Sequence, residues 1–384
     1  GLNLYVDGRF GSFSTNRLDK KELETLITNG IESTRYLAVD ESRMLADPAR
    51  YYKGGKPDLQ LFDKKLYEVN PDDKVAIARA AAEEVLGKDE RIISVDSSYS
   101  DGEGSSYRLI SNGFEGESKS TWFSVSASVS IKGEGEARPQ DYWYDSALFY
   151  DKLTKAGIGA KALERVLRKL GQKKAKSGKY TMVVDPMNVG NLLSPMLSAL
   201  YGSALQQKNS FLMDKLDTKV ASDLFTLRDE PHAIGANGSR YFDNEGVATE
   251  PRTVFDKGVL KTYFIDTYNG KKMDIAPTIS APSRLILTPG DKDLNGLVAD
   301  IKQGILVTGF NGGNSNSSTG DFSYGIEGFL IEDGKLTQPV NEMNVTGNMV
   351  TLWNSLVAVG NDPQPNRSWQ IPSLVFEGVD FSGL

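Results

Sequence analysis

The residue types that most often carry out catalysis or bind metals are scarce in this chain. Its 384 residues include one histidine, His232, in the stretch RDEPHAIGANGSRYFDNEG (228–246), and no cysteine. Without cysteine the chain offers neither a thiol nucleophile nor a thiolate ligand for zinc. A single histidine also excludes the usual catalytic zinc sites, which use three histidines or two histidines and a glutamate. A Ser-His-Asp triad would need His232, so carboxylate, lysine, tyrosine, serine and threonine chemistry stay open.

His232 follows Pro231 in a turn and has no second histidine or cysteine as a partner. Catalytic and metal-binding histidines work within a constellation of groups, because one imidazole alone fixes neither a metal ion nor a proton path. We therefore interpret His232 as a loop residue without a catalytic role.

Asp243 and Glu245 form an acidic pair in the sequence FDNEG. Carboxylates in turns commonly accept hydrogen bonds from nearby backbone amides, and this structural role is the favoured interpretation. The alternative is that the pair lines a cleft, where it receives a peptide or shapes the site of a partner.

Composition and charge are typical of a soluble globular protein. The net charge is −7, whereas binding to nucleic acid favours a basic face. No run approaches the ~18 apolar residues of a membrane span, and no signal-peptide pattern opens the chain. Since cysteine is absent, the disulfides common in secreted proteins cannot form. We predict a cytoplasmic protein without a membrane segment.

The first part of the chain predicts a small α/β unit, residues 1–60. Two strand patterns, 2–6 and 10–15, flank Asp7-Gly8, which is a hairpin signal. A helix is expected over 18–37 and a linker over 40–70. Because a domain rarely begins so abruptly, we expect a segment to be missing before residue 1.

Residues 61–179 predict a middle domain of helices and antiparallel strands. A helix over 70–88 has a capping residue, Asn70, followed by proline and two acidic residues. Strands are expected over 91–99, 105–111 and 120–138, the last with alternating apolar and serine residues.

A second helix is expected over 158–179, with one apolar face and eight Lys/Arg residues in 161–179. A basic helix can follow a phosphate backbone, but most such runs are solvated faces, so we expect no nucleic-acid partner.

Residues 180–384 predict a carboxy-terminal domain with a large mixed, mostly antiparallel sheet, which makes the chain α+β as a whole. A strand over 180–185 precedes a helix over 187–206, and a hairpin over 247–266 turns at Asp256-Lys257-Gly258. A helix over 293–304 leads to a strand over 305–310, followed by a polar loop, NGGNSNSSTGD (311–321). The motif NVTGNM (344–349) is expected to open the last helix.

Several ordered motifs in this half resemble the TldD/PmbA family, the proteins traditionally called modulators of DNA gyrase. The motifs are SFLMDKL (210–216), RDEP (228–231), RYFDNEGVATEPRTVFDKGVL (240–260), GDKDLNGLVADIKQGILVTGF (290–310), STGDFSYGIEGFLIEDGKLTQPV (318–340) and NVTGNM (344–349). They cover about half of the chain, and several motifs in order are far more specific than FDNEG alone. The resemblance implies three domains and a cytosolic proteolytic assembly in which one type of subunit carries a zinc-binding HExxxH helix.

That zinc motif is not present at the corresponding place. The expected register puts NLLSPMLSALYG (191–202) there, with Ser194 and Ala199 at the histidine positions and Pro195 at the glutamate position. Pro195 should also bend the helix, since proline lacks the amide donor and clashes with the preceding turn. The resemblance is therefore to the PmbA (TldE) branch, and we expect no metal, no cofactor and no catalytic residue in this chain.

The resemblance implies a subunit of a peptidase assembly that pairs with a zinc-bearing TldD-like relative, or with itself as a dimer, and helps to hold an unfolded peptide. Two alternatives stay open. One is a stand-alone peptidase that uses Ser194 and the acidic pair. The other is a non-enzymatic binder that modulates DNA gyrase, which only the basic helix favours.

Two polar loops are candidates for binding the peptide. Added strands bind through backbone hydrogen bonds, so they need loops that allow close backbone approach. The candidate residues in 311–321 and 344–349 are Gly312, Gly313, Thr319, Gly320, Thr346, Gly347 and Asn348. If they bind peptide, we expect them to line one cleft together with Asp243 and Glu245. The alternative is that both loops are solvent loops, because such clusters mostly mark turns.

Overall fold

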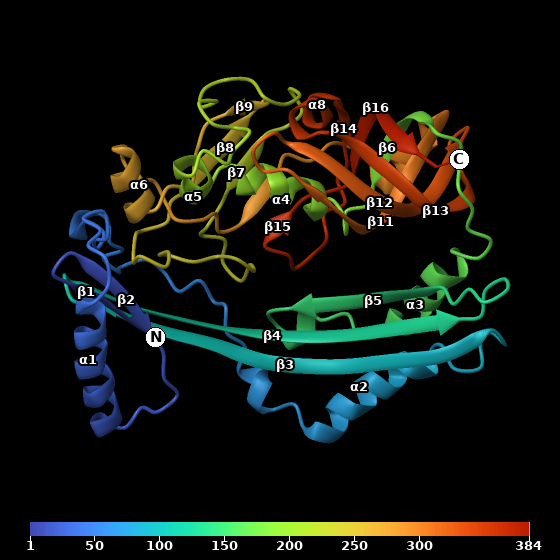
Figure 1. Ribbon diagram of the computed structural model, residues 1–384. Coiled ribbons are helices and arrows are strands. Elements are labelled where there is room, and N and C mark those ends of the chain that lie inside the picture. Colours follow the sequence, from blue (N-terminus) through green and yellow to red (C-terminus); the bar gives the residue numbers. More distant parts are fainter. Residues whose placement is uncertain (384) are drawn as a thin grey trace.

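Residues 1–383, which the computed structural model describes, combine helices with four β-sheets, so the prediction of an α+β chain is confirmed. A long three-stranded sheet lies beneath the carboxy-terminal part, and a hairpin with a helix stands at one end (Figure 1). No helix within the described residues is long and apolar enough to span a membrane.

The amino-terminal unit consists of one hairpin and one helix, as the sequence predicts. Its elements are β1 (Leu2–Val6), β2 (Arg9–Phe13) and α1 (Lys20–Arg35). Asp7 and Gly8 both have positive φ, 48° and 71°, which is the geometry of a tight type I′ hairpin turn. Asp19 caps α1 by accepting a hydrogen bond from the Glu22 amide at 3.0 Å. The chain then runs to residue 70 with only two short 3₁₀ turns, Pro48–Arg50 and Lys64–Tyr67.

The middle part is a three-stranded antiparallel sheet with two helices packed on it. Its elements are α2 (Pro71–Glu83), β3 (Ile92–Ile110), β4 (Phe114–Ile131), β5 (Gln140–Ala147) and α3 (Ile158–Leu167). The prediction of separate strands over 91–99 and 105–111 is wrong, because one strand of 19 residues pairs continuously with β4. Phe123, Val125 and Ile131 of β4 are fully buried beneath the helices, as the alternation predicts.

The predicted basic helix over 158–179 is also wrong in its second half. Helix α3 ends at Leu167, and Gly171 adopts a left-handed φ of 73°. Beyond it, Lys173 donates its amide to the Pro339 carbonyl at 3.1 Å and forms a bridge with Val340. The backbone therefore bonds to a distant strand, a choice that helical periodicity cannot reveal.

The large sheet of the carboxy-terminal part is mixed and mostly antiparallel, as predicted. The strand order is β13-β12-β11-β6-β16-β14, with β6 parallel to β11. Additional pairing of β13 with β16 closes the sheet into a ring of five strands, with β14 outside it. The strands are β6 (Gly178–Val184), β11 (Gln303–Ser315), β12 (Asp321–Glu332), β13 (Lys335–Asn348), β14 (Leu356–Val359) and β16 (Leu374–Ser382).

A second sheet of five short strands and five short helices complete this part. The strands are β7 (Leu227–Asp229), β8 (Arg252–Asp256), β9 (Val259–Leu260), β10 (Leu285–Leu287) and β15 (Trp369–Gln370). The helices are α4 (Gly190–Ser198), α5 (Gly202–Gln206), α6 (Thr267–Met273), α7 (Leu294–Ala299) and α8 (Met349–Asn354). The hairpin of β8 and β9 turns at Asp256-Lys257-Gly258, as predicted.

Three predictions for the carboxy-terminal part need correction. The helix expected over 187–206 is two helices, because the Leu200 carbonyl and the Gly202 amide both bond to Phe264. The helix expected over 293–304 ends at Ala299. The loop expected over 311–321 begins later, since β11 continues to Ser315 and pairs with β12.

Ion pairs join the middle part to the large sheet. Arg165 of α3 lies 3.2 Å from Asp141 of β5, and Lys169 lies 3.2 Å from Asp141 and 2.7 Å from Glu327 of β12. Arg165 also approaches Asp185, at the end of β6, to 3.9 Å. The side chains of these five residues are at most 16% exposed, so their charges depend on one another for stabilisation.

We expect Gly159→Ala to destabilise the fold by about 2 kcal/mol, because an added methyl group in a packed crossing forces the backbone apart. At this position a Cβ atom would lie 1.9 Å from the carbonyl oxygen of Ala81 in α2. The control is Gly190→Ala in α4, where a Cβ atom meets nothing within 4 Å and alanine favours the helix. Urea unfolding would measure both, and equal midpoints for the two variants would contradict the close contact of α2 with α3.

Candidate functional site

Helix α4 lies where the family resemblance leads us to expect the zinc motif. Leu192, Leu193, Met196 and Leu197 are buried in the core shared by the two carboxy-terminal sheets, and Ser194 is exposed on the other side. No hydrogen bond within residues 1–383 involves the Ser194 hydroxyl, so no base is positioned to activate it.

The residues of α4 do not fit a zinc ion. Ser194 offers a neutral hydroxyl, Pro195 carries no donor atom on its side chain, and Ala199 is a fully buried methyl group. Protein zinc sites use thiolate, imidazole and carboxylate ligands. No group of three such side chains with the spacing of a metal site occurs in the described residues.

An unpaired strand edge lies next to the segment that leads into α4. Strand β11 pairs with β6 only over Gly304–Val307, although it pairs with β12 as far as Ser315. Beyond Val307, its β6 side has no neighbouring strand among the described residues. Asn188, in the turn before α4, donates its side-chain amide to the Thr308 carbonyl at 2.9 Å and so holds the beginning of this edge.

The two predicted peptide loops meet at the tip of the β11–β12 hairpin. Asn348 donates its side-chain amide to the Thr319 carbonyl at 2.8 Å and to Asp321 at 2.9 Å. The Thr319 hydroxyl also bonds to Asp321, at 2.8 Å. The hydrogen bonds from Asn348 and Thr319 lower the pKa of Asp321, which therefore stays charged and fixes the loop.

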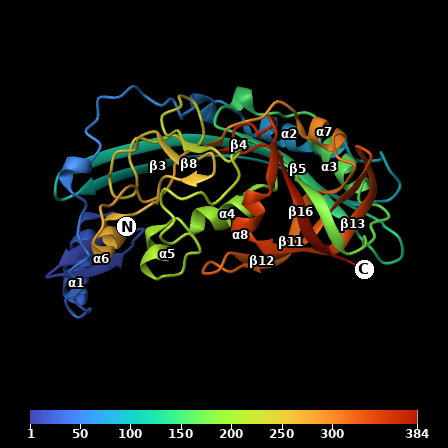
Figure 2. The ribbon, with the colours of Figure 1, turned by 90° about the horizontal axis from the view of Figure 1, so that it is seen from above.

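The hairpin tip is packed against the loop that follows α5, as Figure 2 shows from above. The Phe211 amide donates to the Ser317 carbonyl at 2.9 Å, and the Phe211 ring lies against Gly320. Gly320 has a φ of 81°, which suits glycine.

The remaining candidate glycines and Thr346 belong to paired strands. Gly312 and Gly313 have positive φ beside irregular pairing of β11 with β12, and a Cβ atom on Gly313 would lie 2.1 Å from the Ser323 carbonyl. Thr346 pairs with Ser323 and Asp380, and Gly347 lies against the Phe322 ring. The edge of β13 at Thr346 is therefore already covered by β16.

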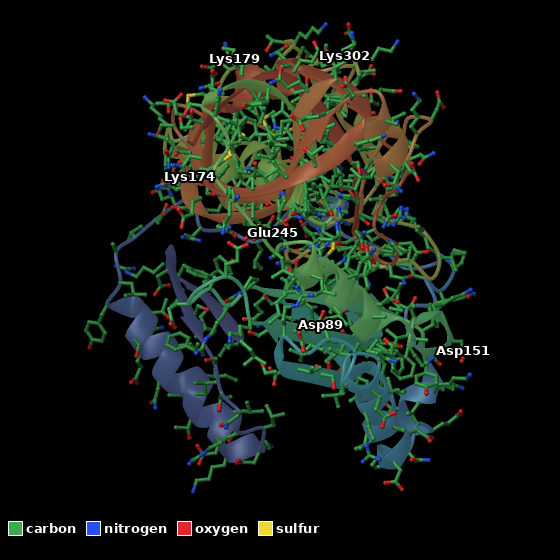
Figure 3. All side chains as sticks on the ribbon, turned by 90° about the vertical axis from the view of Figure 1, so that its right-hand side faces the viewer. Asp89, Asp151, Lys174, Lys179, Glu245 and Lys302 are labelled. Atoms are coloured by element: carbon green, nitrogen blue, oxygen red, sulfur yellow. The ribbon has the colours of Figure 1, made fainter. Side chains whose placement is uncertain are left out.

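Asp243 and Glu245 bond to the backbone, as the favoured interpretation of the turn expects. Asp243 is 2% exposed and accepts hydrogen bonds from the amides of Glu245, Val247 and Ser280 at 2.8, 3.0 and 3.0 Å. Glu245 accepts from the amide and hydroxyl of Thr267, at 3.0 and 2.9 Å, at the start of α6. Burial raises the pKa of Glu245, which lies where the carboxy-terminal part meets the elements below it (Figure 3).

No direct hydrogen bond joins the acidic turn to the two loops within the described residues. Asp243 lines a cavity of about 410 Å³, together with Tyr241, Lys119 of β4 and Lys56 of the linker. The structure therefore brings the two loops together at the hairpin tip, whereas the acidic pair bonds to other segments, at Ser280 and Thr267.

His232 bonds to a threonine in a loop, and within residues 1–383 it belongs to no group of three side chains that could hold a metal ion. Its Nε2 lies 3.0 Å from the Thr249 hydroxyl, and its ring lies 5.0 Å from that of Tyr241. Burial, with a smaller contribution from Lys56, lowers the pKa of His232.

Sequence reasoning missed Asp185 and Asn188, which connect β6 to α4. Asp185 is buried, accepts a hydrogen bond from the Met187 amide at 2.7 Å, and has a pKa raised by that burial. The sequence signal for both is their place just after the apolar strand YTMVV: Asp185 follows it directly, and Asn188 comes three residues later. Polar side chains at the carboxyl ends of parallel strands commonly lie at functional clefts.

The family models and the relatives that match this chain all come from the PmbA/TldD proteins, and the relatives match along the whole chain. Residues 64–170 match the PmbA/TldA metallopeptidase central domain, and residues 177–383 match the PmbA/TldA metallopeptidase C-terminal domain. The chain is 28% identical to a metalloprotease PmbA homolog of Haemophilus influenzae and 27% identical to metalloprotease PmbA of Escherichia coli O157:H7. Each match covers all of this chain and 85% of the relative.

Solved structures agree with these matches. A Bacteroides thetaiotaomicron protein described as a modulator of DNA gyrase superposes with a TM-score of 0.98 at 74% identity, covering 100% of this chain and 87% of that one. TldE from Thermococcus kodakarensis has the same fold, with a TM-score of 0.82 at 22% identity over 99% of this chain and 89% of that one.

We expect Asp243→Ala to lower the free energy of unfolding by at least about 3 kcal/mol, because one buried and two part-buried amides would lose a charged acceptor worth roughly 1.5–3 kcal/mol per bond. Asp243→Asn keeps one acceptor oxygen and should lose less. Chemical denaturation would measure both variants. If Asp243→Asn keeps full stability but removes the activity of an assembly that contains this chain, the structural interpretation of this turn is contradicted.

We expect His232→Ala to leave the activity of an assembly that contains this chain unchanged. The variant should also weaken the dependence of folding stability on pH. Because the folded pKa of His232 lies below the unfolded value of about 6.5, the unfolded chain takes up a proton first as the pH falls. This histidine therefore lowers the stability of the folded state below about pH 6.5. Denaturation midpoints at about pH 8 and about pH 5.5 should differ less for the variant than for the parent chain. A large loss of activity at unchanged stability would disprove the loop interpretation.

Proposed function

The chain belongs to the PmbA/TldD metallopeptidase family, and from this membership we propose that it acts as a TldE-like subunit that holds an unfolded peptide for a zinc-bearing relative. Its relatives are named metalloproteases, whereas its own α4 offers no residues that fit zinc. The peptide bond would then be cleaved at a site that another subunit provides.

One observation carries this proposal: the turn that leads into α4, a helix whose residues do not fit zinc, lies against the beginning of the unpaired edge of β11 over residues 308–315. A strand edge binds extended peptides through backbone hydrogen bonds and reads little of their sequence. Glycines at 309, 312 and 313 carry no side chain that would hinder an approaching backbone. The tip of the hairpin is held by Asn348, Asp321 and Phe211, so the edge is ordered before a peptide arrives.

The partner in this proposal is a TldD-like subunit with an HExxxH helix, or a second copy of this chain in a dimer. The fold shared with TldE from Thermococcus kodakarensis supports the TldD-like partner, because it is the fold of a TldE protein. The covered share of the relatives, 85%, supports a subunit built on the same plan as PmbA.

Neither alternative function has a specific observation in its favour. A stand-alone serine peptidase would need a base near Ser194, and no hydrogen bond of that hydroxyl occurs within residues 1–383. A binder of nucleic acid would need free cations on the basic segment 161–179. Its Arg165 and Lys169 are buried in ion pairs, and Arg168 lies 4.5 Å from the Phe329 ring.

The proposal predicts that the purified chain neither retains stoichiometric zinc nor cleaves an unstructured casein digest, and that adding a zinc-bearing TldD-like subunit produces cleavage. Elemental analysis and a peptidase assay measure these two outcomes. Hydrogen exchange on the mixed assembly, with the zinc subunit inactivated at its glutamate, should show slower exchange at residues 308–315 when the digest is added.

The exposed edge of β3 (Ile92–Ile110) is the internal control, since it is also unpaired on one side and should exchange unchanged. Cleavage by this chain alone would overturn the subunit role. Protection at β3 with none at 308–315 would overturn the proposed peptide edge and leave the subunit role intact.

A further inference from the structure

A cavity of about 500 Å³ lies between the middle part and the carboxy-terminal part, away from α4. Its walls come from the segment after β5, with Phe149 and Lys152, from the turn at Gly235 and Asn237, and from the chain before and within β15. Figure 1 shows β15 on the underside of the carboxy-terminal part, facing β4 and β5. A volume in this range suits a small-molecule ligand.

Three cations line this cavity, Arg284, Arg367 and Lys152, and no carboxylate lines it. Within residues 1–383 none of the three side chains takes part in an ion pair or donates a hydrogen bond. The Nε atom of Arg284 is buried without any partner. Desolvation lowers the pKa of both Arg284 and Arg367, and the charge of Glu230, which forms no ion pair with Arg284, opposes that shift at Arg284.

The nearest carboxylates are already engaged elsewhere. Asp229 accepts hydrogen bonds from the backbone amides of Ser283 and Arg284. Glu230 lies 2.7 Å from Arg228, and Asp151 pairs with Lys65. These interactions fix the backbone around the cavity and leave the guanidinium groups inside it without an anion.

The Arg367 side chain and the backbone around it are held in position by other contacts. The guanidinium of Arg367 lies 4.6 Å from the ring centre of Tyr144 in β5, which is a cation–π contact across the two parts. The Gln370 side chain donates to the Arg367 carbonyl at 2.6 Å, and the Asn237 side chain donates to the Asn366 carbonyl at 3.2 Å. The cavity is therefore preorganised, and an oxyanion entering it would find donors already in place.

We propose that this cavity binds the oxyanion of a small ligand, a carboxylate or a phosphate group, through Arg284 and Arg367, with Lys152 at the mouth. A planar guanidinium donates two parallel hydrogen bonds to either anion. The apolar surface of Phe149, Leu148 and Ile234 next to the cations would accept the uncharged part of the ligand. The site goes beyond the proposed peptide edge and does not depend on it.

The test uses three probes at constant ionic strength: inorganic phosphate, N-acetyl-leucine, and N-acetyl-leucinamide as the uncharged match. Thermal unfolding and calorimetric titration of the full chain should detect binding of phosphate or of N-acetyl-leucine, and no binding of the amide. Arg284→Gln and Arg367→Gln should each weaken that binding at least ~10-fold, since each removes a charge-assisted bidentate contact. Arg138→Gln is the matched control, because Arg138 is exposed and far from these residues in the sequence, and it should bind as the parent chain does.

Stability without any probe gives a second readout. Since Arg284 carries a buried donor without a partner, Arg284→Gln should unfold at the same temperature as the parent chain or above it. Preference for phosphate or for N-acetyl-leucine would identify the source of the oxyanion. Absence of binding by both anions, equal binding by the Arg284→Gln variant, or a clear loss of stability in that variant would each overturn the proposed site.

Discussion

The buried charges of Arg165, Lys169, Asp141 and Glu327 set the position of the middle part against the large sheet. A buried cation is costly unless a carboxylate lies against it, so each of these residues restricts where the others can be. The cations come from α3 and the residues that follow it, and the carboxylates come from two different sheets. This mutual requirement fixes an interface that apolar contacts alone would leave free to slide. The cavity that contains Arg284 and Arg367 lies between the same two parts and depends on their position.

Several buried carboxylates in this chain serve as acceptors for backbone amides. Asp243, Asp229 and Glu245 each accept hydrogen bonds from amides in turns or at a helix start, and all three avoid contact with arginine side chains at ion-pair distance. A carboxylate can accept hydrogen bonds from several amides at once, so it stabilises loops and turns that lack regular backbone pairing. The consequence is that some arginines are left without anions. Arg284 is the clearest case, because its neighbour Asp229 bonds to the arginine backbone and not to its side chain.

The region around α4 combines the fold of a metallopeptidase family with side chains that cannot hold a metal. Ser194, Pro195 and Ala199, where the resemblance leads us to expect the metal ligands, carry a hydroxyl, a ring and a methyl group, and the surrounding strands and hairpin are ordered. The surrounding framework depends on apolar packing and backbone pairing and does not require the metal ligands. The turn before α4 therefore lies next to an extended strand edge that forms without metal ligands.

The sequence by itself determined the features that arise from local chemistry. The hairpin at Asp7-Gly8, the cap of α2 by Asn70, the alternation of β4 and the turn at Lys257-Gly258 all follow from preferences of neighbouring residues, and each is present. The single histidine and the absent cysteines limited the chemistry before any fold was known, and the ordered motifs identified the family.

Only the tertiary structure decided the features that depend on distant partners. The segment after Leu167 leaves the helix, and the Lys173 amide bonds to the Pro339 carbonyl. The separation of Asp243 from the hairpin tip, and the unpaired guanidinium of Arg284, likewise result from which chains meet in space. Local sequence carries the preferences of each segment, but it does not carry the identity of a partner more than a hundred residues away, and that partner supplies the deciding hydrogen bond or charge.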